Sequence, residues 1–169
     1  MEASESFYDI GFDPGARNTA VACSNDAVFQ PCVLDLGPLH TTSDREVIDV
    51  LNNSLISLFS DPALRCVICE AGETAAFAAQ KDFRVSARLF LIQGALQTLS
   101  FVWNKEFRLV RPAVWKRAYN NGIWKSISYE ANKQWSVDKA VELFGEHYRR
   151  RIHHACEAKL LSEYRIRYE

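Results

Sequence analysis

The chain of 169 residues lacks a long uncharged apolar run, and it also lacks an apolar segment near its start. Without such a run the sequence gives no indication of a membrane span, so no membrane partner is expected. The acidic opening "MEASES" does not have the composition of a secretory signal or of a transit peptide. We therefore expect an intracellular, non-secreted protein whose residues 1–6 are frayed, and the compartment stays open.

Internal repeats, low-complexity tracts and long linkers are lacking as well. A chain of this length can bury a substantial core. Its hydrophobic fraction of 48% and aromatic fraction of 12% are typical of globular rather than disordered proteins. The sequence therefore predicts a single domain over residues 1–169.

Cysteines are few and odd in number, five in total. In a chain without a secretion signal, an odd number favours free thiols over a disulfide framework. Cys66 and Cys69 have CxxC spacing, but they lie within "RCVIC", which has the composition of a β-strand. Residues three apart on a strand point to opposite faces, which argues against a zinc site or a redox dithiol.

The net charge of −1 hides an asymmetry along the chain. Residues 1–101 contain 6 Lys and Arg against 13 Asp and Glu, a balance of −7. Residues 102–169 contain 14 against 8, a balance of +6. An acidic half beside a basic half permits a metal-binding cleft that faces a polyanion, and ordinary scatter of surface charge is the alternative.

Apolar runs predict five strands, at about residues 7–13, 17–24, 28–36, 65–70 and 107–112. Helical spacing predicts helices at about residues 41–59, 74–103 and 153–168. The order of these elements predicts an α/β fold, with a mixed five-stranded sheet flanked by helices.

Helix boundaries can also be predicted from capping residues. Ser43 and Glu46 have the spacing of a capping box at the start of the first helix. Pro112 fits the first turn of a shorter helix. A further helix is expected from Ser136, as its N-cap, to Gly145, with residues 120–135 as a loop.

The first predicted strand ends at an aspartate within "YDIGFDPGARNTAVA", residues 8–22. Pro14 and Gly15 interrupt the apolar pattern, which resumes at Asn18 as a second strand. A carboxylate at the end of a buried strand must be solvated, paired or bound to a metal, because burying it alone is very costly. Asp13 is therefore either a turn residue that bonds nearby amides or a functional carboxylate.

Two further acidic side chains are expected to lie near Asp13. Glu70 ends the strand "RCVICE", and neighbouring strands lie about 5 Å apart, so its carboxylate could share a cation with Asp13. Glu157 lies on the last predicted helix, where His153 and His154 precede it by four and three residues on the same surface. Each residue alone also fits a helix-terminal or surface role, but two acids at strand ends favour a common site.

Oxygen ligands of this kind suit Mg²⁺ or Mn²⁺, and a single imidazole is also compatible with Mn²⁺. Two such cations about 4 Å apart activate a water and stabilise the leaving oxygen in phosphodiester hydrolysis. The acidic cluster therefore indicates a metal-dependent phosphodiesterase.

"IGFDPGARNTAVA", "CVICEAG" and "HHACEAKLL" occur in this order along the chain. Together they resemble the first strand and turn, the second acidic strand and the final helix of the RuvC-type Holliday junction resolvases, which belong to the RNase H-like superfamily. "RPAVWKRAY" resembles a proline–tryptophan–lysine stretch of the phage, viral and organellar branches. The resemblance covers most of the chain, and its order and spacing are more specific than any one motif.

The resemblance implies an RNase H-like fold, a homodimer, and a resolvase that makes paired symmetric nicks in four-way DNA junctions with two Mg²⁺ or Mn²⁺ ions per site. It implies four residues that are both catalytic and metal-binding: Asp13, Glu70, His154 and Glu157. His154 stands where many members have aspartate, so it is either a ligand or a proton-transfer group. The family spacing favours His154 over His153.

A DNA substrate requires basic groups for its phosphates and a side chain that holds strands apart at the junction. Phe77 and Phe83 are candidates for stacking on bases, and core packing is the simpler interpretation of each. Arg84 and Arg88 share one face of the long helix, which is also the best candidate for the dimer interface. The candidate phosphate-binding residues are Lys81, Arg84, Arg88, Lys116, Arg117, Lys125 and Lys133. The tryptophans expected to anchor the core or a loop are Trp115, Trp124 and Trp135.

Three other interpretations stay open. A different RNase H-like enzyme would cut RNA or other branched DNA. "DPGARNT" also resembles the phosphate loop of actin-like and sugar-kinase-like ATP-binding folds, although the sequence shows neither the second loop nor the second domain of that class. A catalytically inactive junction-binding module is disfavoured, because competent residues occupy all four proposed positions.

Overall fold

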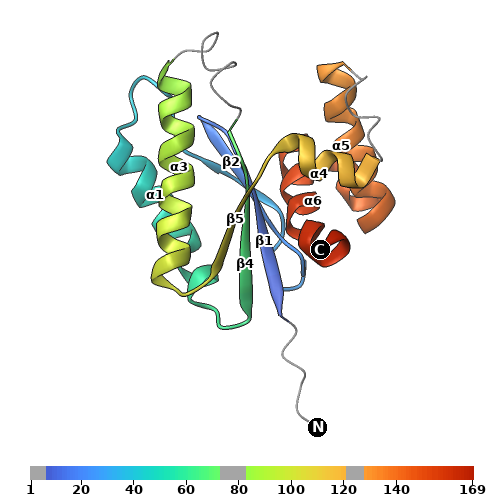
Figure 1. Ribbon diagram of the computed structural model, residues 1–169. Coiled ribbons are helices and arrows are strands. Elements are labelled where there is room, and N and C mark those ends of the chain that lie inside the picture. The colour runs from blue at the N-terminus through green and yellow to red at the C-terminus, as the bar shows by residue number, and fades with distance from the viewer. Residues whose placement is uncertain (1–6, 73–82, 121–127) are drawn as a thin grey trace.

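The computed structural model describes residues 7–72, 83–120 and 128–169 (Figure 1). A five-stranded sheet has the order β3-β2-β1-β4-β5, in which β1 pairs antiparallel with β2 and parallel with β4. β2 pairs antiparallel with β3, and β4 pairs parallel with β5, so the sheet is mixed. The strands are β1 (Tyr8–Pro14), β2 (Asn18–Cys23), β3 (Cys32–Asp35), β4 (Leu64–Glu70) and β5 (Glu106–Val110).

Helices cover both faces of the sheet (Figure 1). α1 and α3 lie together on one face, and α4, α5 and α6 lie on the other. A short 3-10 helix, η2, connects α5 to α6. The helices are α1 (Asp44–Ser60), α3 (Phe83–Val102), α4 (Pro112–Asn120), α5 (Tyr129–Phe144), η2 (Glu146–Arg150) and α6 (His153–Tyr168).

The alternation of side chains along the strands decides which residues face α6. On β1, Ile10 and Phe12 belong to the core on the α1 and α3 side, so Gly11 and Asp13 point to the opposite face. On β4, Cys69 belongs to that first core, whereas Ile68 packs with residues of α4 and α6. Glu70 shares the face of Ile68. The two strand-end carboxylates therefore lie on the same side of the sheet, under α6.

Small residues allow α6 to lie directly on the sheet. Ala158 packs with Ala20 and Ala22 of β2. A Cβ atom placed on Gly11 would lie 2.1 Å from the carbonyl oxygen of Ala158 and 2.5 Å from the backbone nitrogen of Ser162. No side chain fits at Gly11 unless the helix backbone moves away from the strand.

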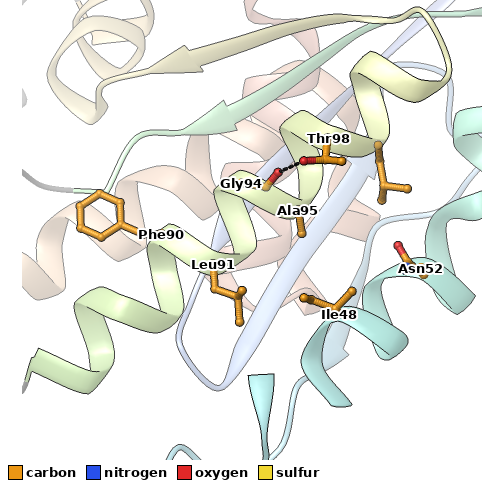
Figure 2. Close-up of a pocket in the computed structure, with 8 residues that line it drawn as sticks. Ile48, Asn52, Phe90, Leu91, Gly94, Ala95 and Thr98 are labelled. Carbon is orange, nitrogen blue, oxygen red and sulfur yellow. Dashed lines mark hydrogen bonds between the residues drawn. The ribbon is translucent and has the colours of Figure 1, made fainter. Parts of the chain in front are cut away.

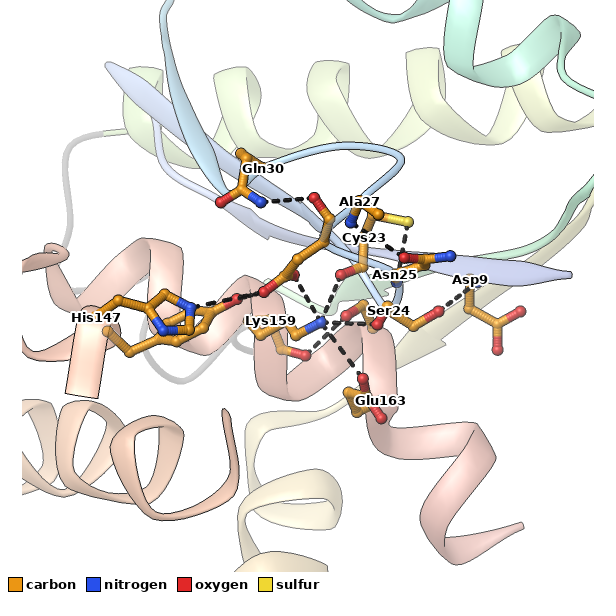
Figure 3. Close-up of polar contacts among 12 residues, drawn as sticks. Asp9, Cys23, Ser24, Asn25, Ala27, Gln30, His147, Lys159 and Glu163 are labelled. Atoms are coloured by element: carbon orange, nitrogen blue, oxygen red, sulfur yellow. Dashed lines mark hydrogen bonds and ion pairs between the residues drawn. The ribbon is translucent and has the colours of Figure 1, made fainter. Parts of the chain in front are cut away.

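Buried ion pairs fix α6 along its length. Lys159 donates to the carbonyl oxygens of Cys23 and Ser24, both at 2.8 Å, and pairs with Asp26 at 2.8 Å (Figure 3). Nearer the C-terminus, Arg165 forms two hydrogen bonds to the fully buried Asp9 on β1. A buried carboxylate requires such a partner, because its desolvation is otherwise uncompensated. The helix is thus attached to the end of β2 and to the beginning of β1.

Several expectations from the sequence are confirmed. The sheet is mixed and five-stranded. Ser43 and Glu46 form the predicted capping box of α1, and α4 begins at Pro112. Cys66 and Cys69 point to opposite faces of β4, where both are buried free thiols.

Two expectations are wrong. β3 covers only Cys32–Asp35, because Asn25–Val28 form a turn. Helix α5 begins at Tyr129, and the residue that caps it is Ser128, which accepts a hydrogen bond from the amide of Ala131. Ser136 therefore lies inside α5, where its hydroxyl oxygen is 3.1 Å from the carbonyl oxygen of Asn132. The first part of the predicted helix over 74–103 lies outside the described residues.

Helix α3 is long and largely apolar. Among the described helices, it is the one that is long enough and apolar enough to cross a membrane by length and composition alone, and 28% of its 18-residue apolar stretch is buried. One such helix is weak evidence for a membrane span. Ile92 and Leu96 of this helix are fully buried in the core against the sheet.

We expect Gly11→Ala to destabilise the chain by at least about 2 kcal/mol, because the added methyl group meets helix backbone. Urea unfolding measures the change. Gly94→Ala is the matched control: apart from adjacent residues and the nearby backbone of its own helix, nothing lies within 4 Å of a Cβ there. That variant gains up to about 1 kcal/mol from the higher helix propensity of alanine. An unchanged stability of Gly11→Ala would contradict the close approach of α6 to β1.

Candidate metal centre

Three of the four predicted ligands meet in the structure. One ligand atom from each of Asp13, His154 and Glu157 lies within 4.8 Å of the others. Asp13 is near the end of β1, while His154 and Glu157 occupy the first turns of α6. The site forms because α6 begins directly over the end of β1.

Glu70 lies beside this group at the end of β4. Phe12 of β1 is in register with Cys69 of β4, so Asp13 and Glu70 follow at corresponding positions of two parallel strands. The backbone oxygen of Glu70 accepts a hydrogen bond of 3.1 Å from the side chain of Gln93 on α3. This contact connects the end of β4 to the helix on the other face.

The two adjacent histidines are distinguished by their contacts. Nδ1 of His154 contacts the carboxylate oxygen Oδ2 of Asp13. His153 stacks against His154, with 3.9 Å between the ring centroids, and is not part of the cluster with Asp13 and Glu157. The geometry thus brings His154 to the carboxylates, and its role as a ligand stays a prediction.

Burial and mutual repulsion perturb the carboxylates. Burial raises the pKa of Glu70 to about 8, with further contributions from the charges of Asp13 and Glu157. Burial also raises the pKa of Asp13, against the lowering effect of its bond to His154. That bond is the main reason why the pKa of His154 is raised. A proton held by Glu70 below about pH 8 reduces the repulsion among the acids.

Two neighbouring groups favour the ionised form of Glu157. Burial by itself would raise its pKa, but the ammonium of Lys116 and the hydroxyl of Ser136 lower the pKa below its ordinary value. Lys116 Nζ lies 2.7 Å from Glu157 Oε1, and Ser136 Oγ lies 2.9 Å from the same oxygen. Both partners come from helices on the same face of the sheet, α4 and α5.

Sequence reasoning assigned other roles to three residues of this site. Trp115, expected as an anchor of the core or a loop, is fully buried and also donates its indole N–H to Glu70 Oε2 at 2.8 Å. Lys116, expected at a DNA phosphate, pairs with Glu157. Ser136, expected as a helix cap, contacts Glu157. The adjacent "WK" in "RPAVWKRAY" was the available signal, but it does not specify which acids the side chains meet.

The predicted DNA-binding residues are spread over several elements. Arg84 lies 2.6 Å from His40, and Arg88 is 4% exposed and donates to the carbonyl oxygen of Thr42 at 2.6 Å. Phe83 is 80% exposed at the start of α3. Arg117 is exposed on α4, whereas Lys133 of α5 lowers the pKa of His154 and so lies near the cluster. Their roles in DNA binding stay predictions. The candidates that lie outside the described residues are Phe77, Lys81 and Lys125.

The donor set fits a divalent cation. Carboxylate oxygens with one imidazole are typical ligands of Mg²⁺ or Mn²⁺. Burial raises the pKa of Asp13 and of Glu70, and the charges of neighbouring acids raise both further, so a cation placed among them would offset that repulsion. The cluster of Asp13, His154 and Glu157 could therefore hold a metal ion.

No protein-family model and no curated protein sequence matches the chain. Among solved structures, T. thermophilus RuvC in complex with Holliday junction substrate aligns with a TM-score of 0.70 and 12% identity, over 92% of this chain and 90% of that chain. Another Thermus thermophilus RuvC structure gives a TM-score of 0.69 and 13% identity, over 92% and 91%. The chain has the RuvC-type fold. This confirms the RNase H-like architecture that the sequence predicted.

Without a divalent cation, we expect the free energy of unfolding to fall as the pH rises toward about 8, the pKa of Glu70. Because this pKa is raised in the native state, the native chain keeps a proton that the unfolded chain has released. The stabilisation is fully present below the pKa of glutamate in the unfolded chain, and it is lost as the pH rises through about 8. Each unit of pKa difference between the native and unfolded chains corresponds to about 1.4 kcal/mol, so the loss amounts to a few kcal/mol. The raised pKa of His154 acts in the same direction.

Urea unfolding at about pH 5 and about pH 8 measures this loss. Glu70→Gln should flatten the pH dependence, and Glu142→Gln, at a surface position on α5 paired with Lys139, should leave it unchanged. An equal slope in Glu70→Gln and in the unmodified chain would contradict the raised pKa.

Proposed function

We propose that the chain is a Holliday junction resolvase, a metal-dependent endonuclease that makes paired symmetric nicks in four-way DNA junctions. The observation that carries the proposal is the meeting of Asp13, His154 and Glu157, beside Glu70, on a RuvC-type fold. One similar structure is a complex of RuvC with a Holliday junction substrate. The reaction class that these groups suit is hydrolysis of a phosphodiester bond.

The residues that would hold Mg²⁺ or Mn²⁺ are Asp13, Glu70, His154 and Glu157. Two such ions, when bound, supply an activated water and stabilise the leaving oxygen. Asp13 is central because it contacts His154 directly and is coupled to the charges of both glutamates. Two ions per site are proposed because Asp13 on β1 has the other three proposed ligand residues around it.

Lys116 adds a positive charge at the same place. Its side chain is 11% exposed, and its ammonium pairs with Glu157 at 2.7 Å, so it lies beside any phosphate that the acidic cluster would hold. A lysine in such a position attracts the phosphate and stabilises the charge that develops on it. Lys133, which lowers the pKa of both histidines, contributes positive potential from α5.

A substrate with two-fold symmetry suits an enzyme that is itself a two-fold dimer. Helix α3 exposes a row of large apolar side chains, including Phe90 at 64% and Phe101 at 85% exposed. Beside Phe90, a groove of about 550 Å³ runs between α3 and α1 and is lined by Ile48, Leu91 and Ala95 among others (Figure 2). We propose that a second copy of the chain packs on this surface.

The proposal is tested by incubating the chain with a synthetic four-way junction and either Mg²⁺ or Mn²⁺, with each strand labelled separately. Nicks at symmetric positions on two opposite strands are the expected result. A linear duplex and an RNA–DNA hybrid serve as competitors, because preference for either would favour another RNase H-like activity. ATP binding in place of junction binding would favour the actin-like interpretation.

We expect Asp13→Asn to abolish cleavage and to keep junction binding, since the amide cannot replace a charged ligand. Loss of several kcal/mol of metal-dependent stabilisation corresponds to a rate decrease of roughly a thousandfold. His154→Ala should also lose most cleavage. The adjacent His153→Ala is the matched control and should retain activity. If the two histidine variants behave in the opposite way, His153 is the residue of the site.

We expect Phe90→Glu to convert a dimer into a monomer, because it places a charge in an apolar interface. Light scattering after size-exclusion chromatography measures the mass, and paired nicking should become unpaired. Ile166→Glu is the matched control: Ile166 is 52% exposed, but it lies on α6 at the opposite face of the sheet. A wild-type chain that is monomeric at micromolar concentration would exclude this dimer.

A further inference from the structure

Trp115 makes a specific hydrogen bond to one carboxylate of the candidate metal centre. The indole Nε1–H donates to Glu70 Oε2 at 2.8 Å. Trp115 is 0% exposed, so its N–H requires an acceptor within the protein. The acceptor is Glu70 rather than a backbone carbonyl, although backbone acceptors are far more common in a fold.

The ring of Trp115 is held in place on several sides. It packs with Cys66 and Ile68 of β4 and with Leu160 and Leu161 of α6. Close packing of this kind leaves a side chain in one rotamer, so the direction of the N–H is fixed before any ligand binds.

Two other aromatic rings complete the surroundings of Trp115. Trp135 lies 6.2 Å away and Tyr119 lies 6.3 Å away between ring centroids. Tyr119 is itself anchored by a 2.7 Å hydrogen bond to the carbonyl oxygen of Leu160. The donor therefore belongs to a rigid group that joins α4, α5 and α6.

Consecutive residues of α4 hold two different acids. Trp115 binds Glu70 at the end of β4, and Lys116 binds Glu157 on α6. Glu70 is not among the three residues whose ligand atoms lie within 4.8 Å of one another. The position of Glu70 relative to that group is therefore set by α4 as well as by its own strand.

We propose that Trp115 is a positioning residue, which fixes the orientation of the Glu70 carboxylate toward a divalent cation that Asp13 would also hold. The proposal deepens the proposed function and rests on it. The terminal torsion of a glutamate is broad, so a carboxylate without such a donor samples many orientations. Fixing it in advance lowers the entropic cost of cation binding.

The test is the affinity of the metal-free chain for Mn²⁺, measured by calorimetry without DNA. Replacing Trp115 by benzothienylalanine, in which sulfur stands for the indole N–H, keeps the shape and removes only the donor. We expect the Mn²⁺ dissociation constant to rise by about tenfold or more, the usual effect of losing a partner of a metal ligand. Trp115→Phe should show at least the same loss.

Two controls separate positioning from packing. Trp135→Phe removes an indole N–H from the same aromatic group and should leave Mn²⁺ affinity within about twofold, while thermal unfolding reports any packing loss in each variant. In a Glu70→Gln background, the benzothienylalanine replacement should have no further effect on Mn²⁺ affinity.

An unchanged or tighter Mn²⁺ dissociation constant for the benzothienylalanine chain overturns the proposal, and so does a wild-type chain that binds no Mn²⁺. The outcome is independent of the activity assay. Weakened Mn²⁺ binding without any junction cleavage by the wild-type chain would support the role of Trp115 and reject the resolvase. Junction cleavage by the wild-type chain, together with unchanged Mn²⁺ binding by the benzothienylalanine chain, would support the resolvase and reject the role of Trp115.

Discussion

The repulsion among three carboxylates in a largely buried space is the constraint on which the site depends. Asp13 and Glu157 are 6% and 7% exposed, and the charges of both acids act on Glu70. Desolvated like charges are unfavourable unless they are protonated, paired or bound to a cation. Each acid here uses a different means: Glu70 keeps its proton toward a pKa of about 8, Asp13 contacts His154, and Glu157 pairs with Lys116.

Holding these acids together is energetically unfavourable. The rest of the fold keeps them together because α6 is fixed against the sheet. α6 cannot move away from the sheet to separate the charges, because Lys159 and Arg165 attach it to β2 and β1. Gly11 permits the close approach, and Ala158 faces Ala20 and Ala22 across it. The same small residues that make the helix fit therefore also force its His154 and Glu157 onto Asp13.

The sequence predicted the features that depend on local patterns. Apolar runs that end at Asp13 and Glu70 predicted these acids at the ends of two strands, and the capping box of α1 followed from Ser43 and Glu46. His154 and Glu157 came from the resemblance together with their helical spacing. These patterns involve residues that are close in the sequence, so they can be recognised without knowledge of the tertiary structure.

The remainder depended on contacts between distant segments. Ser136 fits a local capping pattern, but Ser128 caps the helix, and Ser136 meets an acid 21 residues further along the chain. Arg88 has the spacing of an exposed helical residue, yet the segment before α1 covers it and accepts its hydrogen bond at Thr42. Trp115 is an aromatic residue of the core, as expected, but its only polar group, the indole N–H, donates to Glu70. In each case a neighbour 20 or more residues away selects the role, and no local pattern encodes that neighbour.

The pairing of Lys116 with Glu157 also gives a reason for a lysine within the candidate centre. Under the proposed function, Glu157 would hold a cation while its Oε1 also contacts Lys116 and Ser136. If Glu157 held a cation, the ammonium of Lys116 would lose part of its pairing, in a site where an unpaired charge is costly. A phosphate group that arrives with the substrate is the natural replacement. Lys116 would then change from neutralising an acid in the metal-free chain to neutralising the substrate, and both roles require the same buried position on α4.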